Sequence, residues 1–343
     1  MRISGPGRLA ALLCVVLVGG TMAACGSSAG ASATLTLYNG QHEQTTNQLV
    51  AAFEKQTGIT VKVRNDDEDV LANQILQEGS ASPADLIYTE NSPALEKLQE
   101  RGVLAPVDRS TLNAVPSKYN SPRGDWVGVS ARVNVVVYNT GQLQANQVPT
   151  SIMDLADPKW KGKLALAQGE TDFQPIVTSI VAKDGKDAAL TWLKAVKTNA
   201  GSNIYPNAEA LVDQINKGQA EISVLNSYYW YRQRDQVGSA GMHSAISYLS
   251  PGDAGYLVDV SGAGVLKSSK NTAAAQKFLA FLVSKKGQEI IAHDDSWEYP
   301  IGASVSTAKP QKPFNALQPD PLTIAQLGDG ATAVALLQEV QLA

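Results

Sequence analysis

Residues 34–63 read TLTLYNGQHEQTTNQLVAAFEKQTGITVKV. Residues 34–38 alternate polar and apolar side chains, which is typical of a strand, and Asn39-Gly40 ends that run. Apolar residues then recur at helical spacing through Leu49, Val50 and Phe53, and the β-branched run at 60–63 indicates a second strand. This stretch therefore predicts a strand, a helix and another strand, which is the repeating unit of an α/β fold.

The same order of elements recurs along the rest of the chain. A helical pattern at 70–76 precedes a short strand at 85–88, and Pro93 opens the next helix. The long apolar run at 133–138 is suited to cross between two lobes. We expect mostly parallel sheets with helices on both faces. A second α/β unit is predicted from strands at 164–167 and 222–225 and from helices at 176–182 and 208–215. Residues 271–284 and 288–292 are also predicted to be helical.

Residues 1–24 have the layout of a secretory signal peptide. Arg2 and Arg8 precede an apolar run at 9–18 that is too short to span a membrane, and small residues follow it. Cys25 after these small residues is typical of a bacterial lipidation site, where the cysteine becomes the new N-terminus. Met22 is less usual than leucine three positions before it, so simple cleavage stays open. We expect residues 25–32 to form a lipid-anchored tether outside the cell membrane, or in the periplasmic or cell-wall space.

The charge and the cysteine count indicate an exported protein without disulfides and without a nucleic-acid partner. The 343-residue chain has a formal net charge of −4 and contains only two cysteines, Cys14 and Cys25. Cys14 lies in the predicted signal peptide, so the exported protein would have no disulfide and must rely on its hydrophobic core. A mildly acidic body gives no reason to expect nucleic acid as a partner.

Two adjacent phenols, Tyr228 and Tyr229, are the most informative residues for function. An unperturbed tyrosine loses its proton only near pH 10, so two phenolates at neutral pH need a strong local positive charge. Ferric iron is the common ion that supplies it, because hard ions prefer oxygen donors. Without context, a run of aromatic residues is more often part of a core or an interface.

Polar residues also follow two other predicted strands. His42 follows the first strand, Glu90 the third, and the tyrosine pair the strand at 222–225. Open parallel sheets gather ligands beyond the carboxyl ends of their strands, so one imidazole, one carboxylate and two phenols would meet there as a plausible octahedral ferric site. Taken alone, His42 is also explained as a helix-start residue and Glu90 as a charge at a helix N-terminus.

At these residues the chain resembles the ferric-iron-binding proteins of bacterial ABC importers. The segments that carry the resemblance are YNGQH (38–42), EGSASPAD (78–85), YTE (88–90), RVNVVVYN (132–139), NSYYWY (226–231), SGAGV (261–265) and EYP (298–300). The resemblance implies a two-lobe, type II periplasmic-binding-protein fold with a hinge. Its lobes would be 33–133 with 255–305, and 134–254 with 306–343.

The resemblance also implies a function and a ligand set. His42, Glu90, Tyr228 and Tyr229 match the family's four protein ligands to Fe(III). The protein would be a monomeric receptor, not an enzyme, that delivers iron to an ABC permease and its ATPase.

Relatives often complete the iron shell with a small anion such as carbonate or phosphate. Asn91, Asn207 and Asn226 match anion-contacting positions, and Arg132 would offset an anion's charge. The chain departs from the pattern at 169–173, where the sequence GETDF brings two carboxylates that would repel phosphate. An absent anion, a carbonate-like anion and water all remain open at this point.

Two other functions compete with iron transport. An importer receptor for a small organic cation or anion, such as thiamine or a polyamine, would use the aromatic run to enclose its ligand. A metal-dependent extracellular hydrolase is disfavoured, because the sequence has no H-E-x-x-H motif and no cysteine after Cys25.

Overall fold

The computed structural model describes residues 33–168, 171–305 and 309–342. The predicted signal peptide, the tether and the proposed lipidation site Cys25 lie outside these residues. Within the described part of the chain, no helix is both long enough and apolar enough to cross a membrane.

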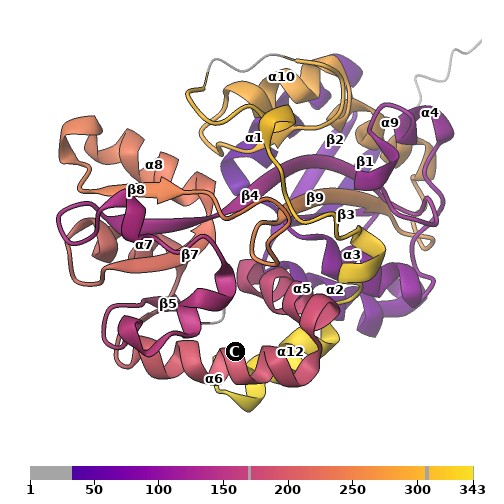
Figure 1. Cartoon of the computed structure of the whole chain (residues 1–343). Helices are drawn as coiled ribbons and strands as arrows, with labels where there is room; N and C mark the ends of the chain where they lie inside the picture. The colour runs from indigo at the N-terminus through magenta and orange to yellow at the C-terminus, as the bar shows by residue number, and fades with distance from the viewer. Residues whose placement is uncertain (1–32, 169–170, 306–308, 343) are drawn as a thin grey trace, which may run out of the picture. The chain divides into compact units, whose positions relative to one another are not determined.

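The β-structure is one large mixed sheet with a small two-stranded sheet beside it (Figure 1). β1 pairs in parallel with β2 and β3, and β9 then lies antiparallel between β3 and β4. The strands are β1 (Thr34–Gly40), β2 (Thr60–Asn65), β3 (Leu86–Thr89), β4 (Val127–Asn139), β5 (Leu166–Ala167), β6 (Ile204–Tyr205), β7 (Ile222–Asn226), β8 (Ser244–Ser247), β9 (Val258–Val265) and β10 (Tyr299–Pro300).

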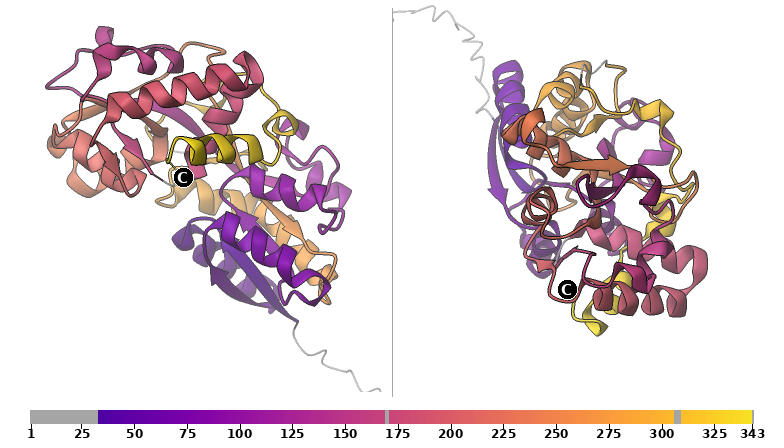
Figure 2. Two further views of the ribbon diagram at one scale, coloured as in Figure 1. Left: turned by 90° about the horizontal axis from the view of Figure 1, so that it is seen from below. Right: turned by 60° about the vertical axis from the view of Figure 1, so that its left-hand side comes forward.

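Helices fill most of the connections between strands. The C-terminal helix α12 contacts both α5 and α6, as Figure 2 shows. The α-helices are α1 (Glu43–Thr57), α2 (Glu68–Glu78), α3 (Ser92–Glu100), α4 (Arg109–Leu112), α5 (Gln174–Asp184), α6 (Lys186–Ala200), α7 (Ala208–Asn216), α8 (Ser227–Val237), α9 (Thr272–Leu282), α10 (Lys285–His293), α11 (Ile324–Leu327) and α12 (Ala331–Glu339).

Strand β4 joins two separate hydrophobic cores. Its first half pairs with β9 and β10 and places Val129 and Ala131 in one core, together with Phe53. Its second half pairs with β7 and β8 and places Val136 in the other core, together with Trp192. These cores resemble the predicted lobes, although the described chain from residue 33 onward forms one compact unit. The lobe boundaries stay a prediction.

Two expectations about the sheet need correction. Mostly parallel sheets were predicted, but β4 pairs antiparallel with β7, β8, β9 and β10. Local periodicity locates a strand but not its direction, which depends on the path of the chain between strands. Strand β9 was not among the predicted strands. The backbone packs closely there, since a Cβ at Gly262 would lie 2.8 Å from Leu95 and from Trp126.

Candidate metal centre

The four predicted ligands lie at the ends of secondary-structure elements and line one cavity. His42 is the N-cap of α1, and Glu90 lies between β3 and α3. Tyr228 and Tyr229 lie in the first turn of α8, directly after β7. The cavity has a volume of about 370 Å³. The carboxylates that line it are Glu43, Asp66, Asp67, Glu68, Glu90 and Glu209.

Direct contacts join side chains from both cores. The Tyr228 hydroxyl donates a hydrogen bond of 2.8 Å to Glu90 Oε1. The His42 ring meets the Tyr228 ring edge-on, with centroids 4.9 Å apart, and the Tyr228 and Tyr229 rings lie 4.1 Å apart. Three of the predicted ligands are therefore in mutual contact, and Tyr229 packs beside them.

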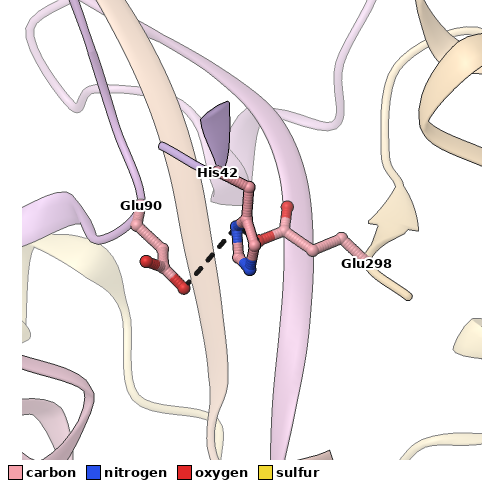
Figure 3. Close-up of side chains that lie close together, drawn as sticks. All are labelled: His42, Glu90 and Glu298. Carbon is pink, nitrogen blue, oxygen red and sulfur yellow. Dashed lines mark ion pairs between the residues drawn. The ribbon is translucent and has the colours of Figure 1, made fainter. Parts of the chain in front are cut away.

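A second carboxylate, Glu298, approaches the same imidazole. His42 Nδ1 lies 3.9 Å from Glu90 Oε1 and 3.8 Å from Glu298 Oε1. Figure 3 shows the ring between the two carboxylates, and one possible donor atom from each of the three residues lies within 4.8 Å of the others. Glu298 was not predicted as a site residue. It lies in the EYP segment at 298–300, which carried part of the resemblance, but an isolated carboxylate there gave no chemical signal.

Gln41 fixes the position of the His42 imidazole. Its Oε1 accepts a hydrogen bond of 2.6 Å from the His42 backbone N–H and also contacts His42 Nδ1. Its Nε2 donates to Ser261 Oγ at 2.7 Å and to Glu298 at 3.3 Å. Because Gln41 is buried, these contacts fix where the His42 ring lies relative to the carboxylates.

Arg132 is the buried cation beneath these groups. Its side chain has no solvent exposure, and Nη1 contacts both the Glu90 carbonyl and Glu298. Nη2 contacts Asn91 Oδ1 and lies 3.2 Å from Asp172 Oδ1. A guanidinium stays charged when buried if carboxylates compensate it, and here the carboxylates raise its pKa although burial alone would lower it.

Asp172 was expected to repel an anion, and it makes four contacts in the site. Oδ2 accepts hydrogen bonds of 3.1 Å from both tyrosine hydroxyls, and Oδ1 accepts one of 3.1 Å from Asn91 Nδ2 in addition to its contact with Arg132. Burial opposes its charge, but Arg132 and the hydrogen bonds from Asn91 and Tyr229 hold the Asp172 pKa below its usual value. Glu170, the other carboxylate of that segment, lies outside the described residues.

Electrostatics favours the protonated form of the Tyr228 phenol. Burial raises the pKa of Tyr228 well above its usual value, and Asp172, Glu90 and Tyr229 add to the effect. Burial and Asp172 also raise the pKa of Glu90, although His42 and Arg132 oppose this rise. A multivalent cation placed among these oxygens would reverse both effects, because it stabilises the anionic forms.

The positions predicted to hold an anion differ in their surroundings. Asn91 is the buried N-cap of α3 and Asn226 is the buried last residue of β7, close to Asp172 and Tyr229 around a small apolar hollow. Asn207 is exposed, and its side chain accepts a hydrogen bond from the Ala210 N–H as the N-cap of α7. Asn91 and Asn226 therefore lie at the centre of the site, whereas Asn207 caps helix α7.

Comparison with known proteins places this architecture in a family. A family model described as a bacterial extracellular solute-binding protein matches residues 81–324. The chain belongs to this family. This solute-binding protein is 37% identical over 328 residues to the "Fe(3+)-binding periplasmic protein" of Serratia marcescens, and the match covers 95% of each chain.

Solved structures agree with that assignment. The solute-binding protein resembles iron-bound HitA from Pseudomonas aeruginosa with a TM-score of 0.85 and 39% identity, covering 90% of this chain and 99% of HitA. It also resembles a Trichodesmium protein in complex with iron and citrate, with a TM-score of 0.77 and 30% identity over 90% of this chain and 100% of that one. The predicted type II periplasmic-binding-protein fold is thereby confirmed.

Proposed function

We propose that this protein captures ferric iron outside the cell membrane with His42, Glu90, Tyr228 and Tyr229 and hands it to an ABC permease. The observation that carries the proposal is the hydrogen bond from the Tyr228 hydroxyl to Glu90, which joins the two cores at a cavity also lined by His42 and Tyr229. Phenolate and carboxylate oxygens are hard donors suited to Fe(III). Relatives named for ferric iron binding match over nearly the whole chain.

Iron binding would proceed by exchange of protons for the metal. The Tyr228 proton is held by Glu90 and Asp172 in the metal-free protein. As Fe(III) enters, the phenolic protons leave to solvent, and the phenolates and Glu90 carboxylate coordinate the ion while His42 supplies a neutral nitrogen. Ligands from both cores then hold the protein around its cargo.

The remaining parts of the proposal concern the cellular setting. A binding role fits a family of solute-binding proteins better than a catalytic one. Delivery requires a permease with its ATPase as partner. We further propose that Cys25 anchors the protein to the outer face of the membrane through a lipid and that the protein acts as a monomer.

A visible absorption titration tests the function. Metal-stripped protein would be titrated with ferric nitrilotriacetate, alongside Tyr228→Phe, Tyr229→Phe and the matched control Tyr231→Phe. Tyr231 lies on the same helix, where it stacks on Trp297. We expect a broad phenolate-to-iron band that saturates near one equivalent in the native protein and in the control, and that fades in the other two variants.

A colourless titration of the native protein would contradict tyrosine-ligated iron. The acidic cavity would then be screened with small organic cations such as thiamine and polyamines, which carboxylates and aromatic rings also attract.

A further inference from the structure

The start of β1 lies beside the segments that lead into β2 and away from β9. The Ala33 carbonyl accepts a hydrogen bond of 3.2 Å from the Thr60 backbone N–H, at the start of β2. The side-chain amide of Asn271, after the end of β9, donates to the Thr34 carbonyl at 3.2 Å. These contacts define one end of the large sheet, and it is the end that the proposed tether precedes in the chain.

Four segments form this end of the sheet, which we call the basic end. They comprise residues 54–60, 78–85, 100–103 and 266–271. The first two lead into β2 and β3, which start beside the start of β1 because both pair with it in parallel. The last two lie side by side, since Lys267 Nζ donates to the Gly102 carbonyl at 2.7 Å.

The surface that these segments offer to solvent is positive. Their exposed charged side chains are one carboxylate, Glu100, and four cations, Lys55, Arg101, Lys267 and Lys270. Their other carboxylates are buried or half-buried and accept hydrogen bonds from protein groups; these are Glu54, Glu78 and Asp85. The basic end therefore differs in sign from the formal net charge of the chain, which is −4.

The acidic groups of the cavity lie at the opposite ends of the same strands. His42 and Glu90, which line the cavity with five further carboxylates, follow the carboxyl ends of β1 and β3. A strand of seven residues such as β1 spans about 20 Å. At about 0.1 M salt the Debye length is only about 10 Å, so a charged surface beside the basic end is screened from the acidic cavity.

The proposed tether is short enough to keep the basic end close to a membrane. Cys25 precedes Ala33 by eight residues, which span at most about 28 Å when extended. Attachment at Cys25 would hold the basic end at a high effective concentration next to the lipid headgroups, so a weak attraction is enough to orient the protein. Each lysine or arginine near an anionic leaflet strengthens binding by roughly fivefold.

We propose that the basic end rests on the anionic phospholipid headgroups at the outer face of the cell membrane, so that the iron cavity points away from the bilayer. The inference rests on one part of the proposed function, the lipid anchor at Cys25. The anchored protein then presents its acidic cavity to cations that arrive from outside. The small residues of the tether allow the protein to leave this surface and turn.

Cosedimentation with vesicles tests the surface without the anchor. Protein that begins at Gly26 would be used, because the chain from Ser32 onward forms one compact unit. Vesicles of phosphatidylcholine would be compared with vesicles of equal parts phosphatidylcholine and phosphatidylglycerol at about 0.1 M salt. We expect at least about tenfold stronger partition onto the anionic vesicles. The difference should disappear at about 1 M salt, where the Debye length is about 3 Å.

Charge reversal at the basic end should remove this preference. Lys55→Glu/Lys270→Glu should weaken partition onto anionic vesicles by at least about tenfold. Lys159→Glu/Lys161→Glu is the matched control, since it changes the net charge equally at exposed positions beside Trp160 of the other core. The control should stay within about threefold of the native protein. Equal losses in both variants would overturn the basic end as the binding surface.

Hydrogen exchange tests the orientation. Protein that begins at Cys25 would be attached through its thiol to a maleimide lipid, so the result does not depend on whether cells acylate this cysteine. On anionic vesicles, and not on neutral ones, backbone amides at 55–60 and 266–271 should exchange more slowly, whereas those at 66–69 beside the cavity should not change. Slower exchange at 66–69 instead would overturn the proposed orientation.

The outcomes separate this inference from the proposed function. Equal partition of the native protein onto neutral and anionic vesicles would overturn the surface and leave the iron receptor intact. Charge-dependent partition by a protein that forms no iron band would overturn the receptor and support the surface. The comparison of vesicles needs no variant, so it tests the surface even if a lysine variant does not fold.

Discussion

The two phenols and the imidazole should not contribute equally to iron affinity. Phenolate carries a negative charge, whereas His42 offers a neutral nitrogen that offsets none of the ion's charge. Tyr228→Phe or Tyr229→Phe should therefore lower ferric affinity more than His42→Gln does, with losses above about tenfold for each tyrosine variant. Chelator competition measures all three dissociation constants, and the reverse ranking would contradict phenolates as the dominant ligands.

Asp259 makes stability depend on pH. Its side chain is 2% exposed, both carboxylate oxygens have no hydrogen-bond partner among the described residues, and burial raises its pKa from the ordinary value of 3.8 to about 7. The folded protein thus holds a proton at Asp259 that the unfolded chain releases between about pH 4 and about pH 7. The stability contributed by this residue is complete below that window and is lost as pH rises through it.

Asp259→Asn should remove this dependence. Relative to the native protein, the variant should gain free energy of unfolding as pH rises from about 4 to about 7, by at most about 4 kcal/mol in total, and the difference should stay level above about pH 7. Urea denaturation at several pH values measures the difference. A constant difference across that range would show that Asp259 does not titrate as described.

At the scale of elements, contacts with Trp297 hold helix α8 in place beyond its two phenols. The ring of Trp297 stacks on Tyr231 with centroids 4.7 Å apart and an interplanar angle of 13°, and its Nε1–H donates to Asp235 Oδ2 at 2.7 Å. Arg234 lies 4.9 Å above the same ring. Because Glu298 follows Trp297 in the chain, this contact ties the orientation of α8 to a carboxylate beside His42.

Loss of the Trp297 contacts should lower both the free energy of unfolding and the affinity for iron. Trp297→Ala should cost about 3 kcal/mol of stability, as large-to-small changes of buried tryptophan do, and should also lower ferric affinity. Trp160→Ala is a matched control, because Trp160 is buried in the same core and donates its Nε1–H to Asp154. It should destabilise the fold with affinity unchanged in the folded protein. Equal affinity losses in both variants would contradict a specific role of Trp297 in positioning α8.

At the scale of the whole molecule, the site joins two hydrophobic cores that share β4. His42 and Glu90 follow strands of one core, whereas Tyr228 and Tyr229 belong to the other. Iron bound by both sets stabilises their contact, so the metal-free protein should sample more open arrangements. Small-angle scattering should show the radius of gyration decrease on iron addition. The Tyr228→Phe/Tyr229→Phe double variant should not contract, and an unchanged radius in the native protein would contradict closure.

The amino-acid sequence by itself determined the local elements and the chemical type of the site. The β1–α1–β2 unit, the helix that follows Asn91 and the strand before the tyrosine pair appear where periodicity and turn residues predicted them. The choice of imidazole, carboxylate and phenols indicated a hard metal ion. These properties depend on neighbouring residues and on side-chain chemistry, so they can be read along the chain.

Only the tertiary structure decided the sheet directions and the partners of each charge. Asp172 is 56 residues from Tyr228, and Glu298 lies 257 residues from the Gln41 amide that contacts it. No local pattern encodes such contacts, because they join residues that are far apart in the chain and meet only in the folded sheet. For the same reason Asp172, which the sequence presented as repulsive, is stabilised by Arg132 and two phenols that reach it through the fold.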